Sequence, residues 1–157
     1  RAEVMDVIGA SKGAVVHGGT YTANLVGLSA ANATLDILNH TNALNTVDAI
    51  GLRIKAVLSS VFTSAGVEHA FAGPPAMLGI HFTSHVPKTY RDWRKTDSRL
   101  YNLFAWELIQ RGVMLEPDSR EPWFFCEAHA SLDLGWLEDI AHQSISAALD
   151  AEARDKA

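Results

Sequence analysis

The sequence contains very little cysteine, because Cys126 is the single cysteine among 157 residues. One cysteine cannot form a disulfide within the chain, and such usage is typical of a reducing compartment. We therefore expect a cytoplasmic protein. Positive charge is also scarce, since 13 lysines and arginines stand against 18 aspartates and glutamates, for a formal net charge of −5. Phosphate contacts need a basic excess or a basic face, so this balance argues against nucleic-acid binding.

Long apolar runs are absent as well. No stretch reaches the roughly 20 residues that span a bilayer, and the start of the chain lacks the continuous apolar middle of a signal peptide. We expect no membrane association. Hydrophobic residues make up 48% of the chain and charged residues 20%, which is typical of a globular protein with a real core. Because the sequence opens on Arg1 without a cap or turn, we expect a piece of a longer polypeptide.

Two apolar patterns in the first part of the chain predict helices. Apolar and small residues recur at helical spacing after a Gly-Gly turn, which predicts a helix that begins near Leu25. A second stripe runs from Val47 to Ala65 and predicts a long helix that Gly66 ends. The polar stretch 39–45 separates the two patterns. We expect the boundary between two structural units there.

The rest of the chain alternates strand and helix patterns. The expected strands lie at 67–71, 78–82, 113–116 and 123–128, and the first two form a hairpin. A helix is expected from about Asp92 to Arg111, closed by Gly112. Another begins with Ser131 as its N-cap and ends in a frayed tail from Asp150. This order predicts an α/β fold with about four strands and helices packed mainly on one face.

Three groups of reactive or charged residues favour structural roles. His81 and His85 have the spacing of a helical metal site, but His81 falls in an expected strand, so we expect no metal site. Cys126 and His129 are close in sequence, which would suit a nucleophilic thiol with a histidine beside it. A cysteine in an apolar strand is, however, typically a buried small side chain. The basic residues within 88–99 alternate with aspartates, which is typical of an exposed helix start.

Two segments are candidate ligand sites. The run 17–24 reads His-Gly-Gly-Thr-Tyr-Thr-Ala-Asn and places hydroxyls and a glycine turn directly before a helix. Free N–H groups at a helix N-terminus together with threonine hydroxyls suit a phosphate, while the same residues also make an ordinary turn and helix cap. The polar loop 118–121 joins two expected strands between prolines. It is a candidate to approach a ligand, although connecting loops are commonly polar.

Several segments in a fixed order carry a family resemblance. Residues 3–6, 17–24 and 30–38 resemble the class III pyridoxal-phosphate-dependent aminotransferases, and in particular their glutamate-1-semialdehyde 2,1-aminomutase branch. Later segments have counterparts in that branch in the same order, at 90–97, 111–115 and 123–129. The resemblance covers essentially the whole chain.

The resemblance implies the C-terminal part of a longer pyridoxal-phosphate enzyme of the aspartate aminotransferase fold, fold type I. Residues 1–40 would end the large cofactor-binding domain, and residues 41–157 would form the small C-terminal α/β domain. Members of this family act as homodimers, in which the Gly-Thr turn reaches the cofactor phosphate bound mainly by the other subunit. Carried over, the cofactor-binding role falls on Thr20, with Gly19 supporting it.

The resemblance also implies what this chain lacks and what it does. The Schiff-base lysine would lie upstream of Arg1, and Lys12 stands outside the family's lysine motif, so we expect no catalytic residue here and no activity from this chain alone. Arg120 and Glu121 stand where the aminomutases have Phe-Glu. This departure favours an aminotransferase that acts on a small-molecule amino donor and acceptor, with both residues as substrate-side contacts. Glutamate-1-semialdehyde 2,1-aminomutase, an isomerase, and a non-catalytic α/β ligand-binding or interaction domain stay open as alternatives.

Overall fold

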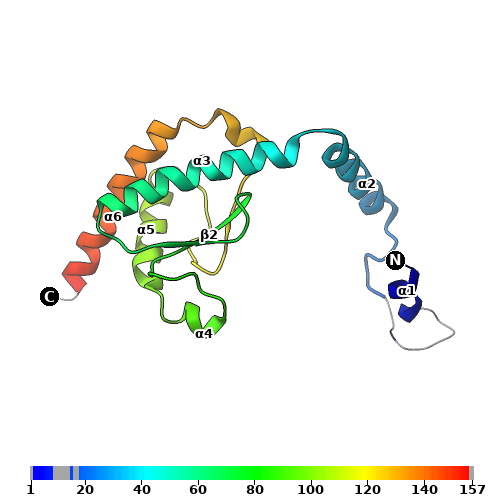
Figure 1. Ribbon diagram of the computed structural model, residues 1–157, viewed down its shortest axis with the longest axis horizontal. Helices are drawn as coiled ribbons and strands as arrows, with labels where there is room; N and C mark the ends of the chain where they lie inside the picture. The colour runs from blue at the N-terminus through cyan, green and yellow to red at the C-terminus, as the bar shows by residue number, and fades with distance from the viewer. Residues whose placement is uncertain (1, 9–14, 16–17, 156–157) are drawn as a thin grey trace. The chain divides into compact units, whose positions relative to one another are not determined.

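The computed structural model describes residues 2–8, 15 and 18–155 (Figure 1). The chain divides into two compact units, Arg1–Thr41 and Asn42–Ala157. Two residues weighed above, Lys12 and His17, lie outside the described residues. The assignment of the first unit to a larger cofactor-binding domain stays a prediction.

The described part of the first unit contains helices and a turn. A short helix α1 (Ala2–Met5) and a 3-10 helix η1 (Asp6–Ile8) precede α2 (Leu25–His40). Asn24 is the N-cap of α2, and its side-chain oxygen accepts a hydrogen bond of 2.8 Å from the backbone N–H of Gly27. Such a cap satisfies one of the free donors of the first turn. The prediction of a helix beginning near Leu25 is confirmed.

The second unit contains three long helices. These are α3 (Ala43–Ser64), α5 (Ser98–Gln110) and α6 (Leu134–Asp155), and α6 packs against both of the others. Gly66 follows α3 with φ +70°, and Gly112 follows α5 with φ +91°. Glycine adopts this left-handed conformation without steric cost, which is why both glycines end their helices as predicted.

A small antiparallel sheet accompanies these helices. Its order is β1 (Ala70–Ala72), β2 (Met77–His81) and β3 (Trp123–Phe124). In register, Ala70 pairs with His81, and Met77 pairs with Phe124. Gly73, at φ +82°, lies in the turn that joins the first two strands. The predicted hairpin is confirmed, and the sheet has three strands among the described residues rather than four.

The missing fourth strand was predicted at 113–116, where Val113 and Leu115 alternate with polar or exposed residues. This segment is irregular, and Met114 is 99% exposed. Val113 and Leu115 pack against the core from a loop, so their alternation comes from tertiary packing rather than from strand pairing. The strand predicted at 123–128 is also shorter than expected, because it ends at Phe124 and the 3-10 helix η2 (Glu127–Ser131) begins three residues later.

Helix boundaries in the second unit differ from the prediction in three places. The helix expected over 92–111 is two helices, because Thr89 caps α4 (Tyr90–Trp93) and Asp97 accepts a hydrogen bond from the N–H of Leu100 to start α5. Ser131 is not the N-cap of α6, since Asp133 accepts from the first-turn N–H groups instead. The tail expected to fray from Asp150 continues as helix to Asp155.

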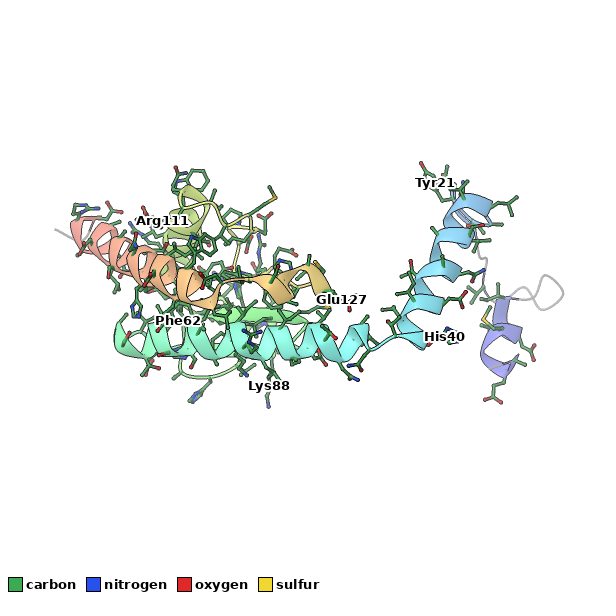
Figure 2. All side chains as sticks on the ribbon, turned by 90° about the horizontal axis from the view of Figure 1, so that it is seen from above. Tyr21, His40, Phe62, Lys88, Arg111 and Glu127 are labelled. Atoms are coloured by element: carbon green, nitrogen blue, oxygen red, sulfur yellow. The ribbon has the colours of Figure 1, made fainter. Side chains whose placement is uncertain are left out.

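The core of the second unit lies where α3, α5, α6 and β2 meet. Phe62 of α3 (Figure 2) is fully buried, and its ring makes edge contacts with Phe82 at 5.0 Å and Phe104 at 5.2 Å between centroids. Aromatic pairs at these separations add to the stabilisation from area burial. Large buried side chains of the other elements complete the cluster: Leu58, Leu78, Ile80, Leu108 and Ile145.

Helix α3 approaches the turn between β1 and β2 very closely at Gly51. A Cβ atom on Gly51 would lie 2.0 Å from the carbonyl oxygen of Pro75. One turn earlier, the carboxylate of Asp48 accepts a hydrogen bond of 3.2 Å from the backbone N–H of Ala76. The turn is therefore attached to α3 by a close approach and a hydrogen bond.

Candidate functional site

The Gly19-Thr20 turn directly precedes the cap of α2. The N–H of Thr22 donates to the carbonyl of Gly19 at 3.0 Å, and the N–H of Asn24 donates to the carbonyl of Tyr21 at 3.1 Å. Gly19 and Thr20 are exposed. Because Asn24 supplies the side-chain cap of α2, Thr20 lies upstream of the cap with its hydroxyl in an exposed turn. An exposed hydroxyl next to glycine backbone can donate to an anion.

Space around this turn suits a close approach by a ligand. Among the described residues, a Cβ on Gly18 would meet no atom within 4 Å, and one on Gly19 would meet the hydroxyl of Thr22 at 3.3 Å. Two adjacent residues without side chains therefore leave room beside the backbone of this turn. The cofactor-binding roles of Gly19 and Thr20 stay predictions.

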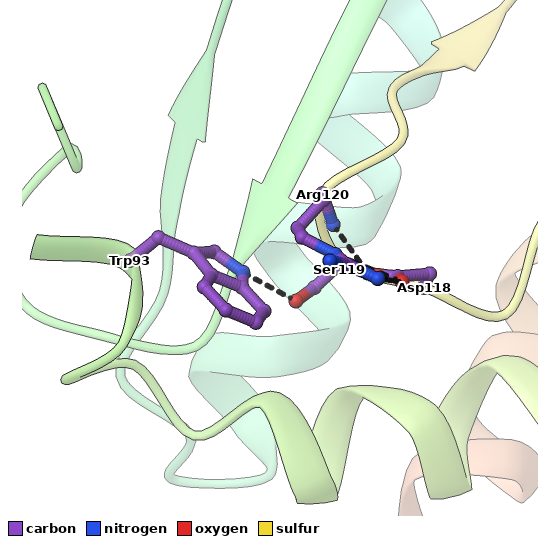
Figure 3. A network of polar contacts seen from close by, with 4 residues as sticks. All are labelled: Trp93, Asp118, Ser119 and Arg120. Carbon is purple, nitrogen blue, oxygen red and sulfur yellow. Dashed lines mark hydrogen bonds and ion pairs between the residues drawn. The ribbon is translucent and has the colours of Figure 1, made fainter. Parts of the chain in front are cut away.

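The second candidate segment, loop 118–121, is held by a polar network (Figure 3). The Nε of Arg120 donates to both carboxylate oxygens of Asp118 at 2.9 Å, and the backbone N–H of Arg120 donates to Oδ1 at 2.9 Å. These hydrogen bonds, first from the Arg120 side chain and then from its backbone, hold the pKa of Asp118 below its usual range. The side-chain hydrogen bonds to Asp118, and then the negative charge of that carboxylate, raise the pKa of Arg120.

Trp93 of α4 fixes the loop from the other side. Its indole Nε1 donates to the hydroxyl of Ser119 at 2.8 Å, and Ser119 is only 2% exposed (Figure 3). The guanidinium carbon of Arg120 lies 5.3 Å from the centroid of the Trp93 ring, within the range of a cation–π contact. Trp93 was not predicted to contact this loop, because 26 residues separate it from Ser119 and no local pattern reports the pairing.

Arg120 and Glu121 line different cavities. Glu121 lines a cavity of about 690 Å³, together with Glu116, Phe124 and Trp136. Arg120 lines a hollow of about 360 Å³, together with Lys88, Tyr90 and Trp93. The structure therefore gives these two neighbouring residues separate surroundings, one beside carboxylates and aromatic rings and the other beside a second cation.

His81 also lines the smaller hollow, from the end of β2. Desolvation by burial lowers the pKa of His81, which favours the neutral ring. Its Nδ1 is buried and has no hydrogen-bond partner in the part of the chain that the structure describes. The described residues contain no group of three or more histidine, cysteine or carboxylate side chains placed to hold a metal ion.

Cys126 differs from its prediction. It was expected to be a buried residue within a strand, but it is exposed and stands at the start of η2. Its sulfur lies 3.3 Å from Nδ1 of His129, and its backbone N–H donates to the same nitrogen at 3.1 Å. The chain leaves the strand after Phe124, so the apolar pattern around Cys126 comes from residues beside the core rather than in the sheet.

Comparison with known proteins tests the family resemblance. No family model matches the chain. The glutamate-1-semialdehyde 2,1-aminomutase of a Thermus thermophilus strain is 30% identical over 135 residues, which cover 85% of this chain and 32% of that protein. The enzyme of the same name from Laribacter hongkongensis is 27% identical over 146 residues, which cover 93% of this chain and 34% of that protein. The predicted resemblance is confirmed.

The chain spans about a third of the length of these aminomutases. A solved structure described as the PLP internal aldimine form of the FumI protein from Sphingopyxis sp. MTA144 superposes with a TM-score of 0.72. The superposed region covers 91% of this chain and 32% of the FumI chain, and the two sequences are 24% identical. This likeness confirms the α/β fold predicted for this chain. None of the helices in its described segments has the length and apolar character that a membrane span requires.

Proposed function

We propose that this chain is the C-terminal part of a pyridoxal-phosphate-dependent aminotransferase, which transfers an amino group between an amino compound and a keto acid or aldehyde. The similarity to glutamate-1-semialdehyde 2,1-aminomutases over 85% or more of the chain carries the proposal. The fold shared with FumI supports it. The whole enzyme would be a cytoplasmic homodimer. Residues 1–40 would end its large domain, and residues 41–157 would form its small domain.

The residues of the glycine turn fit a cofactor phosphate. Pyridoxal phosphate, when bound, supplies an electron sink for reactions at the amine carbon. Thr20 would donate its hydroxyl hydrogen bond to a phosphate oxygen, and Gly19 would let the backbone approach. Their exposure and the separate cap at Asn24 support this role, because neither residue is needed to cap α2. In the homodimer this turn would reach the cofactor bound mainly by the partner subunit.

Loop 118–121 would supply substrate-side contacts. Arg120 is paired with Asp118 through Nε and one terminal nitrogen, so its other terminal nitrogen is directed away from that carboxylate. A guanidinium can bind a second carboxylate through its remaining N–H groups. Glu121 would face the substrate from the larger cavity. The Schiff-base lysine would come from outside this chain, so we expect no amino transfer by the chain alone.

Cofactor retention in the intact enzyme tests the role of Thr20. We expect Thr20→Ala to weaken pyridoxal phosphate binding by about tenfold or more, because a hydrogen bond to a charged group contributes about 1.5–3 kcal/mol. Thr20→Ser keeps a hydroxyl and should retain most of the affinity. Measured dissociation constants that are equal for the alanine variant and the parent enzyme would remove the phosphate role.

The aminomutase is the second candidate function, because the similar proteins carry that name. The two functions differ in whether the reaction needs a second substrate. A mutase moves the amino group within glutamate-1-semialdehyde and needs no second substrate, whereas a transaminase requires a keto or aldehyde acceptor. Incubating the intact enzyme with glutamate-1-semialdehyde alone separates them. Multiple turnovers to the isomer support the mutase, and turnover that depends on an added acceptor supports the transaminase.

A further inference from the structure

We propose that the larger cavity of the second unit binds an organic cation, namely a protonated amine that carries an aromatic or similarly bulky apolar group. This inference rests on the proposed function in one respect, since the amine would be the amino donor of the reaction. The binding itself is a property of the cavity walls. It can therefore be measured without the cofactor.

The volume and walls of the cavity suit an apolar body. Its volume of about 690 Å³ lies within the ~300–1,000 Å³ that small-molecule sites occupy. Most of its lining is apolar or aromatic, and it comes from the loop after α5, from β3 and the residue that follows it, from the residue after η2, and from α6: Val113, Leu115, Phe124, Phe125, Leu132 and Trp136. Phe124 is 64% exposed and Trp136 is 42% exposed, so both rings are accessible to a ligand.

The charge of the cavity favours a cation. Glu116, Asp118 and Glu121 line it, and the described lining residues include no lysine or arginine. Asp118 is already paired with Arg120, whose guanidinium carbon lies over the Trp93 ring. Glu116 and Glu121 are exposed and provide the negative charge that a bound ammonium would meet.

Two physical effects then act in the same direction. Carboxylates attract an ammonium group, and an aromatic ring such as that of Trp136 attracts a cation through its negative face. The same carboxylates repel an anionic ligand of similar shape. A neutral isostere would keep the apolar contacts but lose both electrostatic contributions. The cavity therefore distinguishes a phenylalkyl ammonium ion from the corresponding alcohol.

NMR titration of this chain tests the proposal, with 2-phenylethylammonium as the probe and 2-phenylethanol as its neutral isostere. The indole N–H signal of Trp136 reports on the cavity, while Trp106 of α5 does not line it and serves as the internal reference. We expect saturable shifts at Trp136 and binding of the amine about tenfold tighter than the alcohol. Equal affinity for amine and alcohol would overturn the proposal, as would equal shifts at Trp106.

Matched charge variants locate the interaction. Glu121→Gln and Glu116→Gln should each weaken amine binding about three- to fivefold without affecting the alcohol. Glu138→Gln removes an exposed carboxylate of α6 that does not line the cavity, and it should leave the affinity unchanged. An unchanged affinity in both Glu121→Gln and Glu116→Gln overturns the proposal.

Salt dependence provides a test that needs no variant. Raising the salt from about 20 to about 300 mM should weaken binding of the amine and not of the alcohol, because mobile ions screen exposed charges. Loss of this difference also counts against the proposal. The proposed amino-transfer function is tested by a different experiment, namely cofactor binding in the intact enzyme. Failure of one proposal can therefore be told apart from failure of the other.

Discussion

Replacing Gly51 by alanine should destabilise the second unit, although alanine is the better helix former. The added Cβ would lie 2.0 Å from the carbonyl oxygen of Pro75 and 2.5 Å from its carbonyl carbon. Ordinary contacts of this kind begin at 3.4 Å, so the two backbones would have to separate by about 1.4 Å. The hydrogen bond from Ala76 to Asp48 and the pairing of Met77 with Phe124 resist that movement.

The net effect follows from two opposing contributions. Overpacking typically costs ~1–3 kcal/mol, and a clash with backbone belongs at the upper end of that range. The higher helix propensity of alanine offsets about 1 kcal/mol. We therefore expect the free energy of unfolding to fall by about 2 kcal/mol, which corresponds to about 8 °C in melting temperature for a unit of this size.

Thermal and urea unfolding followed by circular dichroism would measure this change. Ser60→Ala, on the exposed face of the same helix, is the matched control, and its stability should change by less than about 0.5 kcal/mol. A Gly51→Ala variant as stable as the parent would refute the close approach of α3 to the turn at Pro75.

Three further predictions concern single polar groups. Ser144 is fully buried, and its hydroxyl has no hydrogen-bond partner among the described residues. Ser144→Ala should therefore raise the free energy of unfolding by about 1 kcal/mol, measured in urea. A lower free energy of unfolding in this variant would instead show that the hydroxyl makes a hydrogen bond. Tyr101→Phe should lower stability in urea by ~1–3 kcal/mol, because the buried indole N–H of Trp123 donates to the Tyr101 hydroxyl at 3.0 Å; an unchanged midpoint would contradict this pairing. The carboxyl of Asp118 should titrate by NMR below its ordinary pKa of 3.8, since its contacts with Arg120 favour the ionised form. Because the folded pKa is the lower one, the stability from this pair is present at neutral pH and is lost as the pH falls through the folded pKa. In Arg120→Gln the titration midpoint should move back toward 3.8, and the same midpoint in both proteins would contradict the assignment.

The parts of the fold with strong local patterns were predictable from sequence. The long stripe of α3 and its end at Gly66 follow from helical periodicity and from the conformation that glycine permits. The expected strand at 113–116 failed because a loop that packs on a core buries alternate residues just as a strand does. Periodicity reports which side chains are buried and does not report whether the backbone is paired.

The candidate site was predictable only in outline. The sequence places Arg120 and Glu121 side by side, but nothing local indicates that they line cavities of opposite charge. Trp93 of α4 holds the same loop through its hydrogen bond to Ser119, and the 26 residues between them leave no local pattern that reports this contact. The roles of Gly19 and Thr20 came from the order of flanking motifs, and they stay predictions.

Amino transfer by the intact enzyme tests the central claim most directly. The enzyme that contains this chain would be purified, its bound pyridoxal phosphate quantified, and its reaction with an amino donor followed with and without a keto acceptor. We predict one cofactor per subunit and a keto product whose formation over many turnovers requires the acceptor. An intact protein that binds no pyridoxal phosphate and transfers no amino group would contradict the account.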